Sequence, residues 1–558
     1  MLDRRHFLGA GFAALALGLV GSRRASCDAG GRIAPPSGGR PILGLNGLMS
    51  GPTTLIGGYR FSSRFDGDWP EDVSHPPLDA SAQPQSIEEH SEVVVVGGGL
   101  SGLACAYHLR EHRPIVLERL GRFGGASQGE RWRGTEYSLG GAYFIEPDKG
   151  SSLESLYREL GLDRIVRIDA GASPAELNGA FIDDFWTWAG VPDEDRPAFE
   201  AYRELVAYYV EHYPEIPLVD GEDNEWILEL DRVSLKEHVE TALGGAAPAL
   251  LASAIQSYCY SSFGAGWEEI SAASGWNFIA AEEYGRWVLP GGNSTLAERL
   301  WERLSREPGV SLRSSCNVVD IRLDGGDGVV TYDTGAGVRR TIRASKVIVS
   351  CPKYVAKFIV RDLNNLDAEK LDAMQRIEYR PYVVANVLLS VRLERDFYDL
   401  FLLGDGVYPT NAEDAEKFSR PTDVVTGHFA QPGNRNQSVL TLYWPLPWDT
   451  ARFTLTPNVS PLETYAARLA PRLDAILALL ELPKRAVEQV RLVRWGHAMP
   501  VARPGFIADG LAERVRRSIG ETIYFVEQDN WALPAVETCL LEAQSFSAEI
   551  EAGLTVRK

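Results

Sequence analysis

Cysteine is scarce in this sequence. The six cysteines in 558 residues are scattered, at Cys27, Cys105, Cys259, Cys316, Cys351 and Cys539. They form no CxxC pair and no His-rich segment accompanies them, so the sequence predicts neither a disulfide framework nor a metal site. Cys105 and Cys351 fall in apolar runs and are expected to be buried, unreactive thiols.

Basic residues are also in deficit. The chain has 56 Lys and Arg against 76 Asp and Glu, a formal net charge of −20. A surface of this sign repels phosphate backbones and anionic lipid, so no nucleic-acid partner is expected. Two interpretations of the surplus remain open, namely that it keeps the protein soluble or that it attracts a cationic substrate. Beyond the N-terminus no stretch approaches about 18 uninterrupted apolar residues, so no stable membrane span is expected in the mature protein.

The N-terminus has the features of a targeting signal. Arg4 and Arg5 precede an apolar run from Phe7 to Val20, and that run is shorter than the roughly 20 residues that span a membrane. This arrangement resembles a twin-arginine export signal. Residues 1–27 are therefore expected to direct export by the twin-arginine (Tat) machinery, to the periplasm or outside the cell. The cleavage site and lipidation of Cys27 stay open.

The length predicts more than one core, because single cores stop growing at roughly 250–300 residues. Residues 28–90 are rich in Gly, Pro and Ser and are expected to form a linker or extended arm, with regular structure starting near Glu92. Periodicity predicts helices over 196–212 and 234–258, and antiparallel strands over 311–349. Further strands are expected at 382–391 and 523–525, and a helix at 536–552. Strand segments far apart in the chain indicate two interwoven domains.

One segment has the order strand, tight turn, helix, strand. The β-branched run Val93–Val96 indicates a strand buried on both faces of a parallel sheet. A helical pattern follows over 100–110, and 115–117 is the next strand. The turn between the first strand and the helix is GGGLSG, over residues 97–102. This is the context in which a GxGxxG pattern binds a dinucleotide.

Each residue type in this turn suits that role. Gly97 permits the tight turn, Gly99 lets the backbone approach a pyrophosphate, and Gly102 allows close packing of helix on strand. The helix N-terminus supplies N–H groups for the phosphates. Glu118 ends the second strand 21 positions after Gly97, where its carboxylate can accept from ribose hydroxyls.

The residues that follow favour FAD over NAD. A second glycine pair, in RFGGAS over 122–127, resembles the extended fingerprint of the flavin-containing amine oxidase superfamily. That superfamily includes monoamine and polyamine oxidases, phytoene desaturases and protoporphyrinogen oxidases. Further segments resemble it in the same order: SLGGAY at 138–143, LPGGN at 289–293, NVVDI at 317–321, VIVSCP at 347–352, and IYFVEQD at 523–529 followed by Glu537. With its Tat-like start, the chain is similar to an exported bacterial branch.

The resemblance implies an α/β fold in which a FAD/NAD(P)-binding Rossmann-like domain is interwoven with an α+β substrate domain. The FAD-binding domain would comprise 91–150, 286–355 and 490–558. The substrate domain would comprise 151–285 and 356–489. No cysteine lies near Met499, where some members bond the flavin covalently, so the FAD is expected to be non-covalent.

The resemblance also implies the residues that hold FAD. They are Gly97, Gly99, Leu100, Ser101, Gly102, Glu118, Arg119, Arg122, Gly124, Gly125, Ala126, Ser127, Gly140, Gly141, Ala142, Tyr143, Val318, Gln528, Asp529, Ala535 and Val536. The chain departs from the pattern at Ala126, where the family has arginine, and at Glu527, where it has glycine.

Two residues are candidates for the chemistry. Lys357 lies five positions after Pro352, near the place where amine-oxidising members hold a water against flavin N5 with a lysine. The alternative is a surface lysine. Lys353 directly follows the proline and is expected to face solvent. His497 is a candidate for substrate binding or proton handling, or else a packed histidine beside Trp495.

These features predict an FAD-dependent oxidoreductase that oxidises a small organic donor by hydride transfer to flavin N5, with oxygen or another electron acceptor. An amine is one candidate donor, although Ala535 and residues 497–499 lack the two aromatic rings that frame simple monoamines. A desaturase or isomerase acting on a carbon skeleton is the alternative. The departures at Ala126, Glu527 and Ala535 keep open a flavin-binding protein without turnover. An NAD-linked dehydrogenase is disfavoured.

Overall fold

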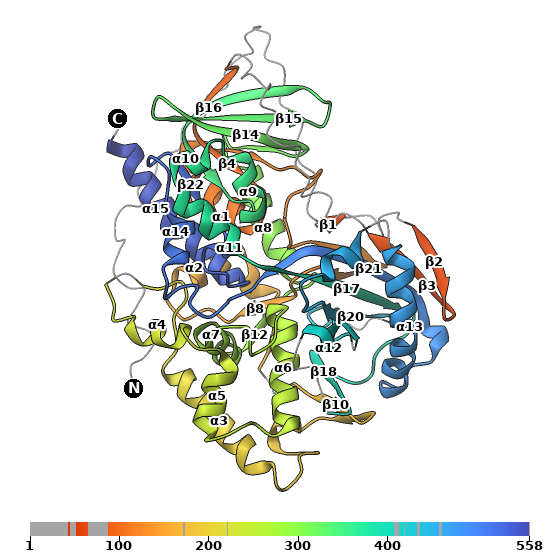
Figure 1. Ribbon diagram of the computed structural model, residues 1–558. Coiled ribbons are helices and arrows are strands. Elements are labelled where there is room, and N and C mark those ends of the chain that lie inside the picture. Colours follow the sequence, from red (N-terminus) through yellow and green to blue (C-terminus); the bar gives the residue numbers. More distant parts are fainter. Residues whose placement is uncertain are drawn as a thin grey trace.

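The computed structural model describes most of the chain. The described residues are 43–44, 52–64 and 87–556, apart from 171–172, 220, 407–411, 418, 432–435 and 457–459. The predicted export signal over 1–27 lies outside them. Figure 1 shows a sheet with helices at the top, a helical region below it and a broad second sheet to the right.

The first sheet has seven strands and carries the GxGxxG turn. Its order is β13 (Ser311–Arg313), β5 (Ile115–Leu117), β4 (Glu89–Val96), β16 (Arg339–Val349), β15 (Asp327–Thr334) and β14 (Cys316–Asp324), with β22 (Ile523–Phe525) also paired to β16. The pairs β13–β5, β5–β4, β4–β16 and β16–β22 are parallel, whereas β14, β15 and β16 form an antiparallel meander. The predicted α/β fold is confirmed. The expectation for 311–313 was wrong, because β13 pairs in parallel with β5 instead of joining the meander.

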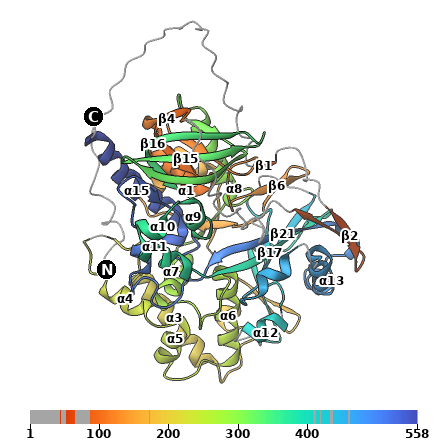
Figure 2. The same cartoon turned by 45° about the horizontal axis from the view of Figure 1, so that its top comes forward.

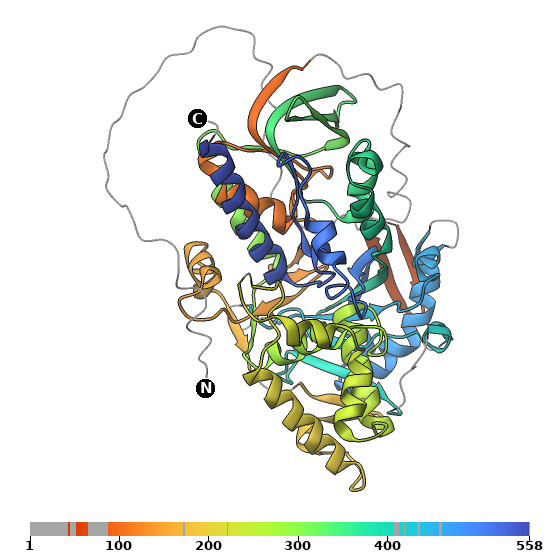
Figure 3. The ribbon, with the colours of Figure 1, turned by 60° about the vertical axis from the view of Figure 1, so that its left-hand side comes forward.

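Three helices bury one face of this sheet. They are α1 (Leu100–His108), α8 (Asn293–Ser305) and α15 (Val536–Val556). α1 packs against both of the others, and Figure 3 shows the dark blue α15 beside the orange α1. Val93 and Val95 are fully buried in the core that these helices form with β4. The three helices bring together segments separated by hundreds of residues.

The second sheet has nine strands and belongs to the substrate domain. Its order is β11 (Ala180–Ile182), β10 (Ala175–Leu177), β18 (Asp399–Gly404), β19 (Asp423–Thr426), β20 (Ser438–Pro445), β17 (Tyr379–Leu389), β21 (Val487–Pro500), β3 (Tyr59–Arg64) and β2 (Thr53–Ile56). α13 (Pro461–Leu479) packs against the β2–β3 end, as Figure 2 shows. Since β21 runs to Pro500, residues 490–500 lie in this sheet and not in the FAD-binding domain as predicted.

The helical region comprises α3 (Arg196–Glu211), α4 (Glu225–Asp231), α5 (Leu235–Leu243), α6 (Ala249–Phe263) and α7 (Ala272–Glu282). The single helix predicted over 234–258 is two helices. α5 ends at Gly244, whose left-handed φ of +75° caps the helix, and Pro248 precedes α6. A glycine in this conformation followed by proline is a strong stop signal.

Shorter elements connect these parts. Two three-stranded sheets are formed by β1 (Leu43–Gly44), β6 (Gly129–Trp132) and β7 (Thr135–Ser138), and by β8 (Tyr143–Ile145), β12 (Arg286–Val288) and β9 (Arg167–Asp169). The remaining α-helices are α2 (Ser152–Glu159), α9 (Lys353–Ile359), α10 (Leu363–Leu366), α11 (Ala368–Arg376), α12 (Ala412–Lys417) and α14 (Leu511–Arg516). Among the described residues, no helix combines the length and apolar character needed to cross a membrane.

Part of the predicted linker is a β-hairpin. Within 28–90, β2 and β3 extend the nine-stranded sheet, and Phe61 lies opposite Val490 in the parallel pairing of β3 with β21. Tyr59 and Phe61 are buried in the core beneath α13, and the Tyr59 hydroxyl donates to Asp474 at 2.5 Å. Residues 28–90 are rich in glycine and proline, which predicted a linker. This composition outweighed the short apolar alternation of β3.

The hairpin is therefore expected to contribute to stability. Phe61→Ala should destabilise the protein by about 3–5 kcal/mol, because it leaves a cavity in a closed core. Leu55 on the paired strand is 75% exposed, so Leu55→Ala should change stability by less than about 0.5 kcal/mol. Thermal denaturation of both variants tests this. Equal melting temperatures for the two variants would show that the arm is not part of the folded core.

Candidate active site

A cavity of about 880 Å³ opens where strands of the first sheet end. Leu117, Val96, Val349 and Phe525 lie in register across the parallel strands β5, β4, β16 and β22. The chain leaves all four strands at the same edge. Ligands of open α/β sheets bind in the crevice beyond such carboxyl ends.

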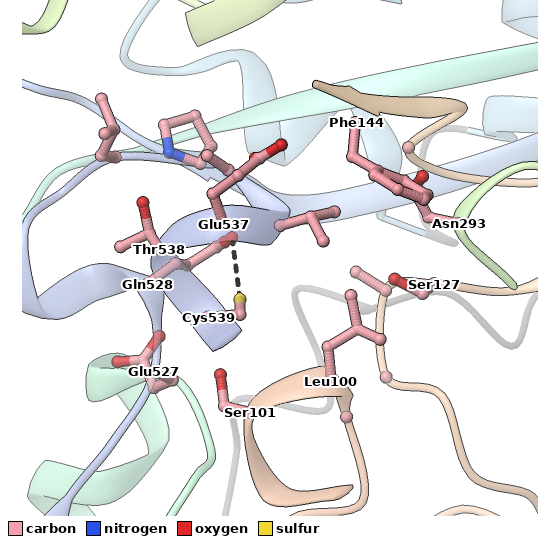
Figure 4. Close-up of a pocket in the computed structure, with 18 of the residues that line it drawn as sticks. Leu100, Ser101, Ser127, Phe144, Asn293, Glu527, Gln528, Glu537, Thr538 and Cys539 are labelled. Carbon is pink, nitrogen blue, oxygen red and sulfur yellow. Dashed lines mark hydrogen bonds between the residues drawn. The ribbon is translucent and has the colours of Figure 1, made fainter. Parts of the chain in front are cut away.

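The glycine turn forms one wall and has no room for side chains. Gly97 has a φ of +112°, and a Cβ there would lie 2.7 Å from the Ser350 carbonyl oxygen. A Cβ at Gly102 would lie 2.0 Å from the Gly97 carbonyl oxygen. The turn therefore lets α1 pack closely against β4. Leu100 and Ser101, at the N-terminus of the helix, line the cavity. Figure 4 shows both residues at the start of α1, with Ser101 beside Cys539 of α15.

Glu118 is held at the same edge. Its two carboxylate oxygens accept from the backbone N–H groups of Gly98 and Leu120, each at 2.7 Å. The residue is only 7% exposed, and burial raises the pKa of its carboxyl group. The two backbone donors orient the group while it lines the cavity. A buried acceptor in this position suits the ribose hydroxyls of a dinucleotide.

The opposite end of the cavity is closed by the second domain. The Tyr443 hydroxyl donates to the Gly140 carbonyl at 2.7 Å, and Trp495 Nε1 donates to the Leu139 carbonyl at 2.9 Å. A Cβ at Gly140 would lie 2.4 Å from the Ala126 carbonyl oxygen, so this turn also requires glycine. Tyr443 and Trp495 come from β20 and β21, so the nine-stranded sheet completes a cavity that the first domain begins.

Most of the residues predicted to hold FAD lie in the wall. These are Gly97, Gly99, Leu100, Ser101, Glu118, Arg119, Gly124, Gly125, Ala126, Ser127, Gly140, Gly141, Ala142, Tyr143, Val318, Gln528, Ala535 and Val536. The other three predicted residues do not line the cavity. Gly102 packs α1, Arg122 donates to the Gln128 side chain, and Asp529 accepts from the Lys353 backbone N–H at 3.0 Å. For all of the residues predicted to hold FAD, direct contact with the cofactor stays a prediction.

The two candidate lysines lie on α9. Lys353 is fully buried and forms an ion pair with Glu527, so the expectation that it faces solvent was wrong. Its ammonium group is removed from water and donates to the Glu527 carboxylate instead. Lys357 is half-buried and is not part of the wall, whereas Tyr354 of the same helix is. Burial lowers the pKa of Lys357, and Arg452 contributes to this. Its role beside flavin N5 stays a prediction.

His497 does line the cavity. Its ring stacks on Tyr354, with centroids 4.1 Å apart and an interplanar angle of 18°. Arg452 Nη1 lies 2.6 Å from His497 Nε2. Because a guanidinium can only donate, Nε2 must be the acceptor. The histidine is therefore oriented by Arg452, and its predicted part in substrate binding or proton handling stays open.

Three carboxylates in the wall form what we call the acidic pocket: Glu282 of α7, Asp399 of β18 and Asp423 of β19. The hydroxyls of Tyr143 and Tyr258 donate to Glu282 Oε1, at 2.5 and 3.1 Å. Sequence reasoning missed this group, because its members come from segments far apart in the chain and belong to no motif.

Among the described residues, one arginine pairs with carboxyl groups of the acidic pocket. Arg286 of β12 lies 3.3 Å from Asp399 and 3.6 Å from Glu282, and it also pairs with Asp169. Burial raises the pKa of Asp423 to about 7 and raises the pKa of Asp399 well above its usual value. Asp399 Oδ1 is buried and has no hydrogen-bond partner among the described residues. The pocket has three carboxyl groups and, among the described residues, a single paired arginine, so it gains surplus negative charge as Asp399 and Asp423 ionise.

A cavity of this size, with a glycine cradle, a buried ribose-type carboxylate and two helix N-termini, fits FAD. A second domain closes its far end. Fold and site together define a two-domain flavoprotein. The sequence profile of the family described as flavin-containing amine oxidoreductase matches residues 100–419. The chain belongs to this family, and the protein is an FAD-dependent oxidoreductase.

Individual relatives agree with this placement. The chain is 22% identical to oxidoreductase PigB of Serratia sp. (strain ATCC 39006) over 538 residues, which cover 86% of this chain and 78% of PigB. It is 43% identical to the flavin-containing amine oxidase A of Canis lupus familiaris over 88 residues, 15% of this chain and 16% of that one.

Two solved structures share the fold. Wild-type putrescine oxidase bound to putrescine superposes with a TM-score of 0.61 at 16% identity, over 83% of this chain and 99% of that chain. The fatty acid isomerase from P. acnes that produces CLA superposes with a TM-score of 0.59 at 14% identity, over 82% of this chain and 98% of that chain. These two likenesses show the fold of the chain.

Glu118 offers a direct test of the cofactor site. Glu118→Ala should weaken FAD binding by about 1.5–3 kcal/mol, because hydrogen bonds from ribose hydroxyls to a charged carboxylate are lost. Glu111→Ala, on the exposed turn after α1, is the matched control and should bind FAD normally. Titration of the apoproteins with FAD measures both. An affinity of Glu118→Ala within twofold of the wild type would exclude the ribose role.

Proposed function

We propose that the protein oxidises a cationic amine and that the acidic pocket binds the ammonium group. The observation that carries the proposal is the cluster of the three carboxyl groups of Glu282, Asp399 and Asp423 in the wall of the FAD cavity, two of which, Asp399 and Asp423, are buried. Inside a protein such charges are screened weakly, so a cation that enters the pocket gains more than it would in water. Asp399 Oδ1, which lacks a partner among the described residues, is an acceptor available to an N–H donor.

The rest of the wall supports a positively charged donor. Glu146, Asp148 and Glu215 also line the cavity, whereas the arginines described in the wall are Arg119 and Arg516. A cleft lined by one sign of charge attracts ligands of the opposite sign. The net charge of −20 acts in the same direction over longer distances. A free carboxylate substrate would be repelled, which disfavours a donor like a fatty acid.

Aromatic side chains shape the same end of the cavity. Residues 497–499 and Ala535 do not supply the two aromatic rings that frame simple monoamines in the family. Tyr143, Tyr443 and Trp495 line the wall instead, and hydrogen bonds to Glu282, Gly140 and Leu139 fix their orientations. Aromatic faces attract ammonium groups within about 6 Å, so these rings support binding of an amine.

These contacts indicate what FAD and the residues of the chain would each contribute to the reaction. Bound FAD would supply the two-electron acceptor for the donor carbon. The chain's own residues would bind the ammonium at the acidic pocket, orient the donor between the aromatic rings and exclude water. The putrescine-bound oxidase among the solved structures has an amine of this class as its ligand. Oxygen is the simplest acceptor for reoxidation.

A donor screen tests the proposal. Diamines, polyamines, monoamines and amino acids would be supplied aerobically, and hydrogen peroxide measured. We expect turnover with amines that carry a second positive charge, since the pocket holds more than one carboxylate. Turnover confined to neutral or anionic donors would overturn the proposal and favour the carbon-skeleton alternative.

The acidic pocket should also impose a pH dependence. Carboxylates bind a cation only when ionised, so the KM for a diamine should rise as the pH falls through about 7, the pKa of Asp423. Asp423→Asn should raise KM about tenfold at high pH and lose this limb. Asp183 is 75% exposed and lies outside the wall, so Asp183→Asn is the matched control, and its KM profile should keep the limb. Identical profiles for the wild type and Asp423→Asn would exclude a role of this carboxyl group.

We also propose that the protein is exported by the twin-arginine route, on the basis of Arg4, Arg5 and the apolar run that follows. This route carries folded proteins, which suits a protein that binds FAD inside the cell. Replacing both arginines with lysine should leave the protein in the cytoplasm, because the receptor recognises the guanidinium pair. Cell fractionation with antibody detection measures this. Unchanged delivery of the double variant to the periplasm would contradict the proposal.

A further inference from the structure

The ion pair between Lys353 and Glu527 lies at the FAD edge of the first sheet. Lys353 begins α9, four residues after β16 ends at Val349, and Glu527 follows β22, which ends at Phe525. Val349 and Phe525 are in register. The two segments therefore leave neighbouring parallel strands side by side, in the crevice where the cofactor binds.

The pair is buried and tightly connected. Lys353 is fully buried and Glu527 is 5% exposed. Glu527 Oε1 accepts from Lys353 Nζ, and Glu527 Oε2 accepts from the Asp529 backbone N–H at 2.9 Å. Asp529 Oδ2 in turn accepts from the Lys353 backbone N–H at 3.0 Å and from the Tyr379 hydroxyl at 2.5 Å. These bonds tie the turn after β22 to the start of α9.

Only the acidic partner reaches the cavity. Glu527 and Gln528 are part of the wall, together with Ser101 at the N-terminus of α1, whereas Lys353 stands behind it. Figure 4 shows Glu527, Gln528 and Ser101 on the same side of the pocket. Cys539 lies near this group, because its thiol donates to Gln528 Oε1 at 3.9 Å and its pKa responds to the Ser101 hydroxyl and to the charge of Glu527. The phosphates of a dinucleotide bind at such a helix N-terminus, so a lone carboxylate here would repel them.

We propose that Lys353 is a positioning residue for FAD, which acts by neutralising Glu527 in the cavity wall. The chain has glutamate where the family pattern has glycine, and the buried lysine compensates for it. Through its bonds to Glu527 and Asp529, the pair also fixes the Glu527–Asp529 turn beside the cofactor. Replacing both residues should therefore weaken FAD binding less than replacing the lysine alone. This inference does not depend on the identity of the donor.

The electrostatic surroundings define a pH signature. Burial raises the pKa of Glu527, the charge of Asp529 adds to the effect, and Lys353 opposes it. The other titratable groups near the pair are Cys351, Cys539, Tyr379 and Lys370. Burial raises the pKa of both cysteines and of the tyrosine, so these groups stay neutral near pH 7. Without Lys353, the Glu527 carboxyl would be protonated at low pH and an uncompensated anion at high pH.

FAD titrations of four apoproteins test the proposal: the wild type, Lys353→Met, Glu527→Gln and the double variant. Lys353→Met should bind FAD about tenfold more weakly than the wild type near pH 9.5, and the loss should shrink near pH 6 as the carboxyl group is protonated. The double variant should stay within about threefold of the wild type at both pH values, because no buried charge is left unpaired. Lys417→Met, a surface control on α12, should have no effect.

Two results would overturn the proposal. In one, Lys353→Met binds FAD like the wild type at both pH values. In the other, the double variant loses as much affinity as Lys353→Met, which would mean that the lysine acts independently of Glu527. If Lys353→Met does not fold, the double variant decides the matter. A folded double variant with near-normal FAD affinity supports compensation, and a double variant that fails to fold or to bind FAD contradicts it.

Discussion

The parallel pairing of β4 with β16 is the constraint on which the rest of the site depends. Val96 lies opposite Val349, so the next residues, Gly97 and Ser350, leave the sheet together. The Ser350 carbonyl fills the space that a side chain at Gly97 would need. This close approach turns the chain into α1 and points the helix N-terminus at the cavity. Helix termini bind anions through unpaired N–H groups, so one strand pairing sets both the geometry and the charge preference of the cofactor site.

The two ends of the cavity have opposite electrostatic character. At the α1 end, backbone N–H groups favour phosphates, and the acidic side chains are bound, Glu118 by backbone donors and Glu527 by Lys353. At the far end, Arg286 is the single cation described as paired with the acidic pocket, which gains surplus negative charge as its carboxyl groups ionise. A negatively charged cofactor and a positively charged donor would therefore bind at separate ends of one cavity. The α1 end belongs to the first domain, and the far end is completed by the second domain.

The sequence predicted most of the residues that line the cofactor end of the cavity, because their positions follow from local rules. Gly97, Gly102 and Glu118 have spacings dictated by a strand, a turn and a helix within one stretch of chain. The substrate half could not be predicted in this way. Glu282, Asp399 and Asp423 come from a helix and two strands whose proximity depends on the packing of the whole domain. Lys353 was misplaced for the same reason, since its partner Glu527 is 174 residues away in the chain. The β2–β3 hairpin was missed because local composition outweighed a short alternating pattern.

The cavity between the two domains is expected to hold FAD without a covalent bond. The most direct measurement is the visible absorption spectrum of the purified protein, followed by denaturation and identification of the released compound by mass spectrometry. We expect a yellow protein with a flavin spectrum, and intact FAD in the supernatant at one equivalent per chain. A colourless protein that cannot be reconstituted with FAD would contradict it.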